Sequence, residues 1–217
     1  MTVPSESWVE RAVDRSAAVQ RSRTRIANQV RLMLDAARRL IGEKDDFTTQ
    51  ELVAEAGVAL QTFYRYFSGK DFLLLAVIED IIDESCDAFR EQAATLPDPI
   101  ERLEFYVTAT VRSLGVPRTG PSFITVEHFR LQTLYPAEIS QATQPFTDLL
   151  VEEIRAAVAI GLLHTQDPDY AAWLITQLTM AVFHHYDCAG LEEPTDVVAA
   201  KLWGFCLTAL GASDGPR

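Results

Sequence analysis

The segment FTTQELVAEAGVALQTFYRYFSGKDFLL, residues 47–74, decides how this chain folds. It predicts two short helices joined by a tight turn. The first helix begins at Thr48 or Thr49, because a threonine hydroxyl can cap a helix N-terminus. Gly57 then supplies the positive φ that a sharp corner needs, and the second helix covers residues 60–66. This order of elements is that of a helix-turn-helix.

The second short helix combines an apolar inner face with an outer face suited to DNA. Phe63 and Phe67 are expected to point inward. Gln61 and Arg65 are expected to point outward, where both side chain types can make paired hydrogen bonds to base edges. No acidic residue occurs from residue 58 to residue 70. The pattern therefore favours a nucleic-acid interface.

Outside this segment the chain is expected to be helical throughout. Apolar residues recur at helical spacing, and no run alternates long enough to indicate a strand. The further expected helices cover residues 23–42, 68–96, 100–114, 122–134, 137–161, 168–190 and 194–211. Together with the two short helices they predict an all-α fold of about nine helices.

Charge is unevenly distributed along the chain. The 217 residues have a net charge of −12, which as a whole argues against a protein that binds nucleic acid. The first 70 residues, however, hold 11 basic and 9 acidic side chains, whereas residues 71–217 hold 8 and 22. Residues 11–39 alone have a net charge of +6. This asymmetry suggests that the N-terminal part meets an anion, although a solvated arginine-rich helix face explains it equally well.

The N-terminal part resembles the DNA-binding domain of TetR-family transcriptional regulators. The resemblance rests on the basic first helix, the turn Ala56-Gly57-Val58, and the run Thr62-Phe63-Tyr64-Arg65-Tyr66-Phe67 followed by Lys70. It implies a basic, flexible arm (residues 1–22) and an N-terminal three-helix helix-turn-helix domain (residues 23–69). A C-terminal helical ligand-binding and dimerisation domain would follow (residues 70–217).

The resemblance also implies roles in DNA binding. Residues that open the first short helix would contact phosphate or a base edge, the second short helix would enter the major groove, and two tyrosine hydroxyls and a lysine would contact phosphate. Arginines before the first long helix would enter the minor groove as an extended arm, or would add only nonspecific charge. Leu60 could instead pack in the turn, and Tyr64 could be partly core. The expected DNA-binding residues are Thr49, Gln50, Leu60, Gln61, Thr62, Tyr64, Arg65, Tyr66, Lys70, Arg21, Arg23 and Arg25.

The last two expected helices are apolar on several faces and so need to be covered. The resemblance implies a homodimer through these two helices. A symmetric dimer suits DNA, because its two recognition helices meet half-sites about 34–36 Å apart. A monomer with a thick core is the alternative.

A small-molecule site is expected among the middle helices, where aromatic side chains alternate with a few polar ones. Plain core packing would also explain such residues. The candidate ligand-binding residues are Phe105, Phe123, His128, Phe129, Trp173, Gln177 and His184. His184 and His185 point about 100° apart on a helix and cannot share one metal ion. No metal-binding, cofactor-binding or catalytic motif accompanies them, so we expect no metal, no cofactor and no enzymatic activity.

These features together predict a ligand-responsive, DNA-binding transcriptional regulator, acting as a repressor. A small, largely apolar effector would release it from a palindromic operator in double-stranded DNA. The charged N-terminus and the lack of about 18 consecutive apolar residues predict a cytoplasmic protein without membrane contact. The alternative is a ligand-binding or protein-interaction module whose helix-turn-helix no longer contacts DNA.

Overall fold

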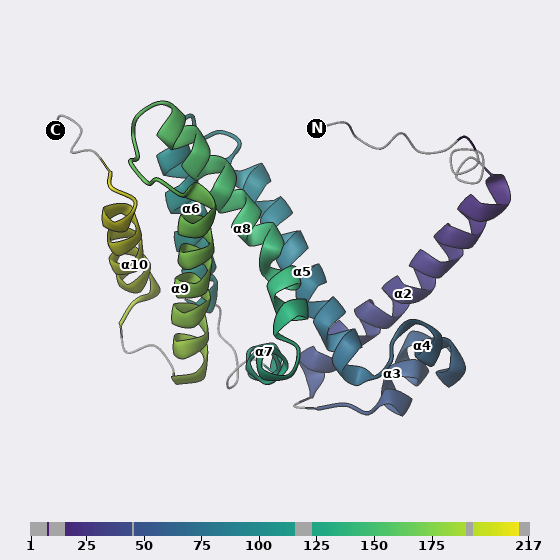
Figure 1. The fold of residues 1–217 in the computed structure, drawn as a ribbon. Helices are drawn as coiled ribbons and strands as arrows, with labels where there is room; N and C mark the ends of the chain where they lie inside the picture. The colour runs from purple at the N-terminus through teal and green to yellow at the C-terminus, as the bar shows by residue number, and fades with distance from the viewer. Residues whose placement is uncertain (1–7, 9–15, 45, 116–122, 190–192, 213–217) are drawn as a thin grey trace. The chain divides into compact units, whose positions relative to one another are not determined.

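The computed structural model describes Trp8 and residues 16–44, 46–115, 123–189 and 193–212, and all regular structure in them is helical (Figure 1). The all-α prediction is therefore confirmed for this part of the chain. The helices are α2 (Ala17–Glu43), α3 (Thr49–Ala56), α4 (Leu60–Tyr66), α5 (Lys70–Ala93), α6 (Pro99–Arg112), the 3-10 turn η1 (Ser113–Gly115), α7 (Phe123–Leu134), α8 (Pro136–Ala159), α9 (Pro168–Ala189) and α10 (Thr195–Ala209). In the ranges described, none of them is long and apolar enough to cross a bilayer.

The chain divides into two compact units, residues 1–77 and residues 78–217. We expected the division after residue 69. The first turns of α5 instead belong to the first unit, and they contribute the buried side chains of Leu73, Leu74 and Val77. The helix then continues into the second unit without a break.

The first long helix begins earlier than expected. α2 starts at Ala17, and it runs through Gly42 to its last residue, Glu43. Residues 17–22 contain neither glycine nor proline, so nothing in them stops the helix. Part of the expected flexible arm is therefore helical. The rest of that arm, apart from Trp8 and the N-cap residue Ser16, lies outside the described residues.

In the first unit, α3 packs against α2 and α4 packs against α3 around apolar side chains. Phe63 is fully buried, and its ring lies 5.7 Å from the ring of Phe67, which is also buried. Met33 and Leu34 of α2 and Leu52 of α3 are buried as well. The prediction that both phenylalanines point inward is confirmed, and their burial fixes which face of α4 points outward.

Local interactions define both ends of α3. At its start, the Thr48 hydroxyl accepts a hydrogen bond from the Glu51 backbone N–H at 3.2 Å, and the Glu51 carboxylate accepts one from the Thr48 N–H at 2.8 Å. This is a capping box. At its end, Gly57 has a φ of 65°, in the left-handed region. The tight turn between α3 and α4 thus has the conformation expected of it.

Alanine substitutions at two glycines of the first unit are expected to have opposite effects on stability. Gly57→Ala should lower the free energy of unfolding by about 1 kcal/mol, because a residue with a Cβ is strained in the left-handed region. Gly42→Ala, the control, should raise it by about 0.5 kcal/mol because Gly42 lies inside α2. A Cβ at either position meets no atom within 4 Å, so backbone conformation alone separates them. Urea denaturation measures both, and a loss at Gly42 would contradict this account.

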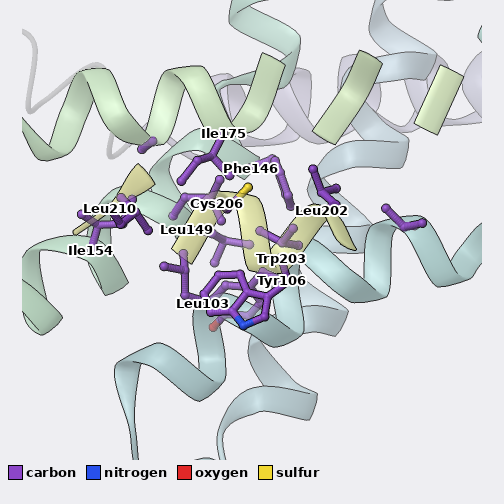
Figure 2. Packing of buried hydrophobic residues seen from close by; sticks show 14 of the residues in the cluster. Leu103, Tyr106, Phe146, Leu149, Ile154, Ile175, Leu202, Trp203, Cys206 and Leu210 are labelled. Atoms are coloured by element: carbon purple, nitrogen blue, oxygen red, sulfur yellow. The ribbon is translucent and has the colours of Figure 1, made fainter. Parts of the chain in front are cut away.

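The second unit is built around α6, which packs against α8, α9 and α10; α7 packs against α8 and α9. Figure 2 shows the buried side chains at the centre of this unit, among them Leu103 and Tyr106 of α6, Phe146 and Leu149 of α8, Ile175 of α9 and Trp203 of α10. This core positions α7 and α9 against each other. Most of the candidate effector residues lie on these two helices.

Candidate DNA-binding and effector sites

The outer face of α4 carries the side chains expected to read DNA. Gln61 and Arg65 are exposed, and Thr62 is half-buried. Tyr64 is exposed, and its ring packs edge-on against the buried Phe63 with 5.1 Å between ring centroids. Its position on the surface leaves its hydroxyl available to a phosphate, and the face as a whole bears no negative charge.

Leu60, the first residue of α4, is also exposed. Leu60 is therefore not buried by packing in the turn, which was the alternative to a DNA contact. An apolar side chain at this place could meet a thymine methyl group in the major groove.

Tyr66 lies differently from the expectation. Its hydroxyl donates a hydrogen bond to Gln29 Oε1 of α2 at 2.8 Å, and its side chain is half-buried. A tyrosine has one hydroxyl proton, and a phosphate oxygen can only accept. In the free protein Tyr66 therefore joins α4 to α2 rather than offering its proton to a phosphate.

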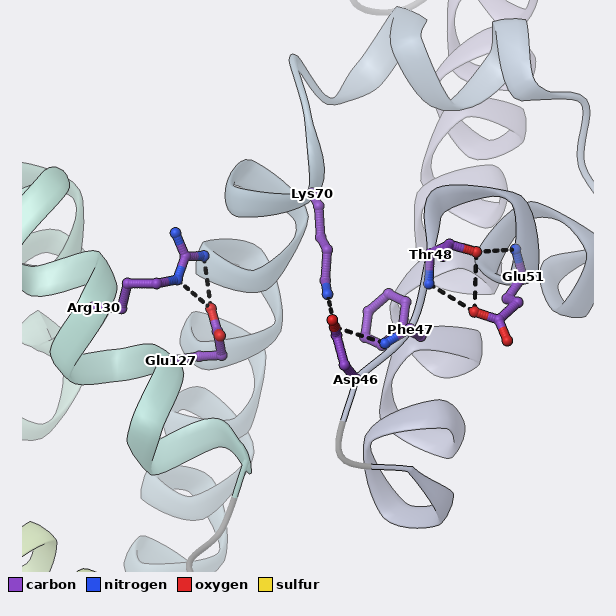
Figure 3. Close-up of polar contacts among 7 residues, drawn as sticks. All are labelled: Asp46, Phe47, Thr48, Glu51, Lys70, Glu127 and Arg130. Carbon is purple, nitrogen blue, oxygen red and sulfur yellow. Dashed lines mark hydrogen bonds and ion pairs between the residues drawn. The ribbon is translucent and has the colours of Figure 1, made fainter.

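Lys70, the first residue of α5, is held in place by two groups (Figure 3). Its ammonium pairs with the carboxylate of Asp46 and lies 4.4 Å from the centre of the Phe47 ring. The Lys70 ammonium, followed by the Phe47 backbone N–H at 2.7 Å, keeps the pKa of the Asp46 carboxyl below its ordinary value. A phosphate that contacts Lys70 would thus have to compete with Asp46.

Thr49 and Gln50 open α3, the first half-buried and the second exposed. The start of this helix already holds the carboxylate of Glu51. The Lys44 ammonium at 2.6 Å, together with the Thr48 N–H and hydroxyl, lowers the pKa of Glu51 to about 2. We therefore expect Thr49 and Gln50 to contact DNA through their side chains rather than through a free helix N-terminus.

Arg21, Arg23 and Arg25 are exposed, but they lie on α2 and not on an extended segment. An α-helix with its side chains is about 10 Å across, and the minor groove is about 6 Å wide. The expectation of an extended arm in the minor groove is therefore corrected for these three residues. On a helix they can present charge to phosphates. Arg21 and Arg25 line a shallow hollow along α2 together with Gln20, Thr24, Asn28, Gln29 and Leu32.

Three of the seven candidate effector residues come together in the second unit. His128 of α7 and His184 of α9 are both buried, with 4.5 Å between their ring centroids. The ring of Phe129 lies 4.8 Å from that of His184. Within the described ranges, no group of three or more His, Cys, Asp or Glu side chains gathers as metal ligands do.

The other four candidates are placed differently. Phe105 of α6 packs against Phe89 at 6.0 Å beside the hydrophobic core. Trp173 of α9 is exposed and stacks on Tyr170 at 5.5 Å, so it does not line a buried site. Phe123 and Gln177 are half-buried. The structure therefore groups the two histidines with Phe129 and sets Trp173 apart from them.

Four buried polar atoms on α7 and α9 have no hydrogen-bond partner among the described residues. They are Nδ1 and Nε2 of His128, Oγ1 of Thr125 and Oγ1 of Thr179. Thr125 lies three residues before His128 and so on the same side of α7. Neither threonine was predicted from the sequence. Thr125 could have been, because it lies three residues before the candidate His128 and so on the same side of the expected helix.

Both histidines of this cluster are neutral at pH 7. Burial, with a smaller contribution from His184, lowers the pKa of His128 to about 4. Burial also lowers the pKa of His184, against a weaker opposite effect of Asp187. Each neutral ring can donate one hydrogen bond and accept another.

The last two helices expose apolar side chains in the single chain. Tyr170, Trp173 and Leu174 of α9 are exposed, as are Val197 and Phe205 of α10. Asp169 and Asp187, near its two ends, are the charged residues of α9. Exposed apolar surface of this kind is typical of protein–protein interfaces.

Residues 33–77 match the sequence profile of the bacterial regulatory proteins of the tetR family. No curated protein matches the chain significantly. Solved structures with a similar fold include RolR in complex with resorcinol, which is 19% identical with a TM-score of 0.70 over 88% of this chain and 91% of that chain. Thermus thermophilus FadR, a TetR-family repressor in complex with lauroyl-CoA, is 15% identical with a TM-score of 0.69 over 87% and 98%. The fatty acid degradation regulator FadR from Bacillus halodurans is 19% identical with a TM-score of 0.65 over 85% and 97%.

Proposed function

We propose that this chain, whose residues 33–77 match the TetR family of bacterial regulatory proteins, is a repressor released from its operator by a small effector. The observation that carries this proposal is the outer face of α4. It exposes Gln61 and Arg65, and no acidic residue occurs between residues 58 and 70. A helix-turn-helix that had lost its DNA would have no reason to keep this face free of negative charge.

The proposed regulator binds double-stranded DNA as a homodimer in the cytoplasm. The exposed apolar faces of α9 and α10 support dimerisation through these two helices. Two copies of α4 would then meet the half-sites of a palindromic operator, about 34–36 Å apart. The excess of acidic residues after residue 70 would repel DNA from the second unit and so favour binding through the first.

The proposed effector binds in the second unit, at the buried pair His128 and His184 beside the exposed ring of Phe129. It favours a conformer of the dimer whose two α4 helices no longer match the operator. It can shift this equilibrium only by its difference in affinity for the two conformers. The unbroken α5, which belongs to both units, supports coupling between them.

A selection from sheared genomic DNA tests the proposal. The purified protein is expected to retain a few duplex fragments selectively, with an affinity that falls as salt concentration rises. Gln61→Ala should weaken binding to the selected fragment by about 1–3 kcal/mol and leave binding to random duplex unchanged. Fluorescence anisotropy measures both.

The control is Gln141→Ala, which removes an exposed glutamine of α8 and should change neither affinity. Equal losses on selected and random DNA from Gln61→Ala would contradict base reading by this residue. A protein that retains no fragment selectively would instead be the module without DNA contact.

A further inference from the structure

The second unit offers no unpaired cation among its described residues. Each of its described basic side chains lies within ion-pair distance of a carboxylate. The pairs are Arg90–Asp87, Arg102–Glu153, Arg112–Asp196, Arg130–Glu127, Arg155–Asp169 and Lys201–Glu193. An anionic ligand that took its counter-charge from one of these described side chains would therefore have to break an existing pair.

The charged side chains closest in sequence to His128 are also paired with each other. Glu127 and Arg130 both lie on α7, and their side chains pair with each other at 2.6 Å (Figure 3). Among the described residues, Asp187 has a weak charge effect on the pKa of His184, smaller than the effect of burial. Burial therefore dominates the electrostatics of the two histidines.

Helices α7 and α9 hold buried hydrogen-bonding groups without a partner among the described residues. Thr125 is 1% exposed, His128 is 7% exposed and Thr179 is completely buried. Their four side-chain polar atoms have no partner among the described residues. Buried polar atoms in folded proteins are nearly always paired, and leaving them without partners is destabilising. A wholly apolar ligand would leave all four polar atoms without a hydrogen-bond partner.

We infer that the effector is an uncharged molecule that carries a hydroxyl group, bound through hydrogen bonds to His128 and to the Thr125 and Thr179 hydroxyls. This inference rests on the proposed function and specifies the chemistry of its ligand. A hydroxyl group both donates and accepts, as do a neutral imidazole and a threonine. A carboxylate or a coenzyme A thioester would bring negative charge into a buried site where every cation of the described second-unit residues is already paired.

Matched ligands that differ in one functional group test the chemical class of the effector. Phenyl, naphthyl and decyl skeletons are each used as the hydrocarbon, the hydroxyl compound and the carboxylate, with lauroyl-CoA as a further ligand. On at least one skeleton, calorimetry should show the hydroxyl compound binding about 10-fold or more tightly than its two counterparts, the difference that one good hydrogen bond makes. Tightest binding by a carboxylate or by lauroyl-CoA, or no binding by any hydroxyl compound, would overturn the inference.

Isosteric variants test the site. Thr125→Val and Thr179→Val each remove an unpaired hydroxyl and keep the shape of the side chain. Each should raise the melting temperature of the free protein by about 2–4 °C and weaken the hydroxyl ligand about 10-fold. His128→Phe should weaken it at least as much. His185→Phe, which changes the exposed neighbouring histidine, should alter neither quantity.

A lower melting temperature in both valine variants, with ligand affinity unchanged, would show that the threonines belong to an ordinary hydrated core and would refute the inference. These assays contain no DNA, so they are independent of the proposed repressor mechanism. A hydroxyl ligand that binds here but leaves DNA binding unchanged contradicts the mechanism and upholds the inference. If lauroyl-CoA releases the DNA and no hydroxyl ligand does, the repressor mechanism is upheld and the inference about the ligand is contradicted.

Discussion

Phe205→Glu on α10 is expected to split the homodimer into monomers and to abolish tight operator binding. Phe205 is 65% exposed in the single chain, and it lies on α10 beside the exposed Gly204. In the proposed interface the new carboxylate would lose its hydration without gaining a counter-charge. Such burial costs several kcal/mol, which weakens dimerisation by about 10³-fold or more.

The loss of operator affinity follows from the loss of the dimer. In a dimer, binding of one α4 helix places the second at a high local concentration near its half-site, and a monomer lacks this advantage. Sedimentation velocity at micromolar concentration measures the oligomeric state, and anisotropy with the selected duplex measures the affinity. Circular dichroism checks that the variant remains folded.

Ile160→Glu is the matched control for Phe205→Glu. Ile160 is 63% exposed at the C-terminus of α8, outside the two helices that the proposal assigns to the interface. The control should remain dimeric and keep its affinity for the operator. A Phe205→Glu protein that stays dimeric, or two variants that dissociate equally, would contradict the proposed interface.

The helix-turn-helix was predictable because short-range interactions define it. The capping box joins Thr48 to Glu51, three residues away, and the turn depends on the conformation of Gly57 alone. The inward face of α4 follows from the spacing of Phe63 and Phe67. Each of these signals fits within one turn of helix, so the local sequence contains it.

Two of the predicted DNA contacts depend on residues that are distant in the sequence. Tyr66 bonds to Gln29, 37 residues away, and Lys70 pairs with Asp46, 24 residues away. Neither partner is implied by a local pattern. The residue types at positions 66 and 70 could therefore be identified as phosphate ligands from the family resemblance, while their partners in the free protein could not.

The effector site shows a different limit of the sequence. Trp173 and His184 lie on nearly the same side of α9 in different turns, so periodicity could not reveal that Trp173 is exposed and His184 buried. The partner of His184 is His128, on a separate helix, and only the packing of α7 against α9 brings them together. The identities of the side chains were predictable, but their grouping was not.

The stability of the second unit is expected to depend strongly on one buried ion pair. Arg102 of α6 donates a hydrogen bond from Nε to the Glu153 carboxylate of α8 at 2.9 Å, and its Nη2 forms an ion pair with the same carboxylate at 2.8 Å. Its Nη1 also donates to the carbonyl of Leu96 at 2.8 Å. The Glu153 side chain is only 8% exposed. This carboxylate is therefore removed from water and depends on Arg102 for its counter-charge.

Arg102→Met should lower the free energy of unfolding by about 3–5 kcal/mol, because it leaves the Glu153 carboxylate buried without a counter-charge. The double variant Arg102→Met/Glu153→Met should recover most of this loss, since two apolar side chains can replace a buried ion pair with little net change. Urea denaturation of the three proteins measures both effects.

The control for the buried pair is Arg155→Met, which breaks the pair between Arg155 and Asp169. Their side chains are 60% and 62% exposed, so the loss should stay below about 1 kcal/mol. The comparison separates burial from charge pairing as such, because both variants remove one arginine from one carboxylate. Similar losses in Arg102→Met and Arg155→Met, or a double variant no more stable than Arg102→Met, would show that the burial of Glu153 is not what makes its pair with Arg102 important.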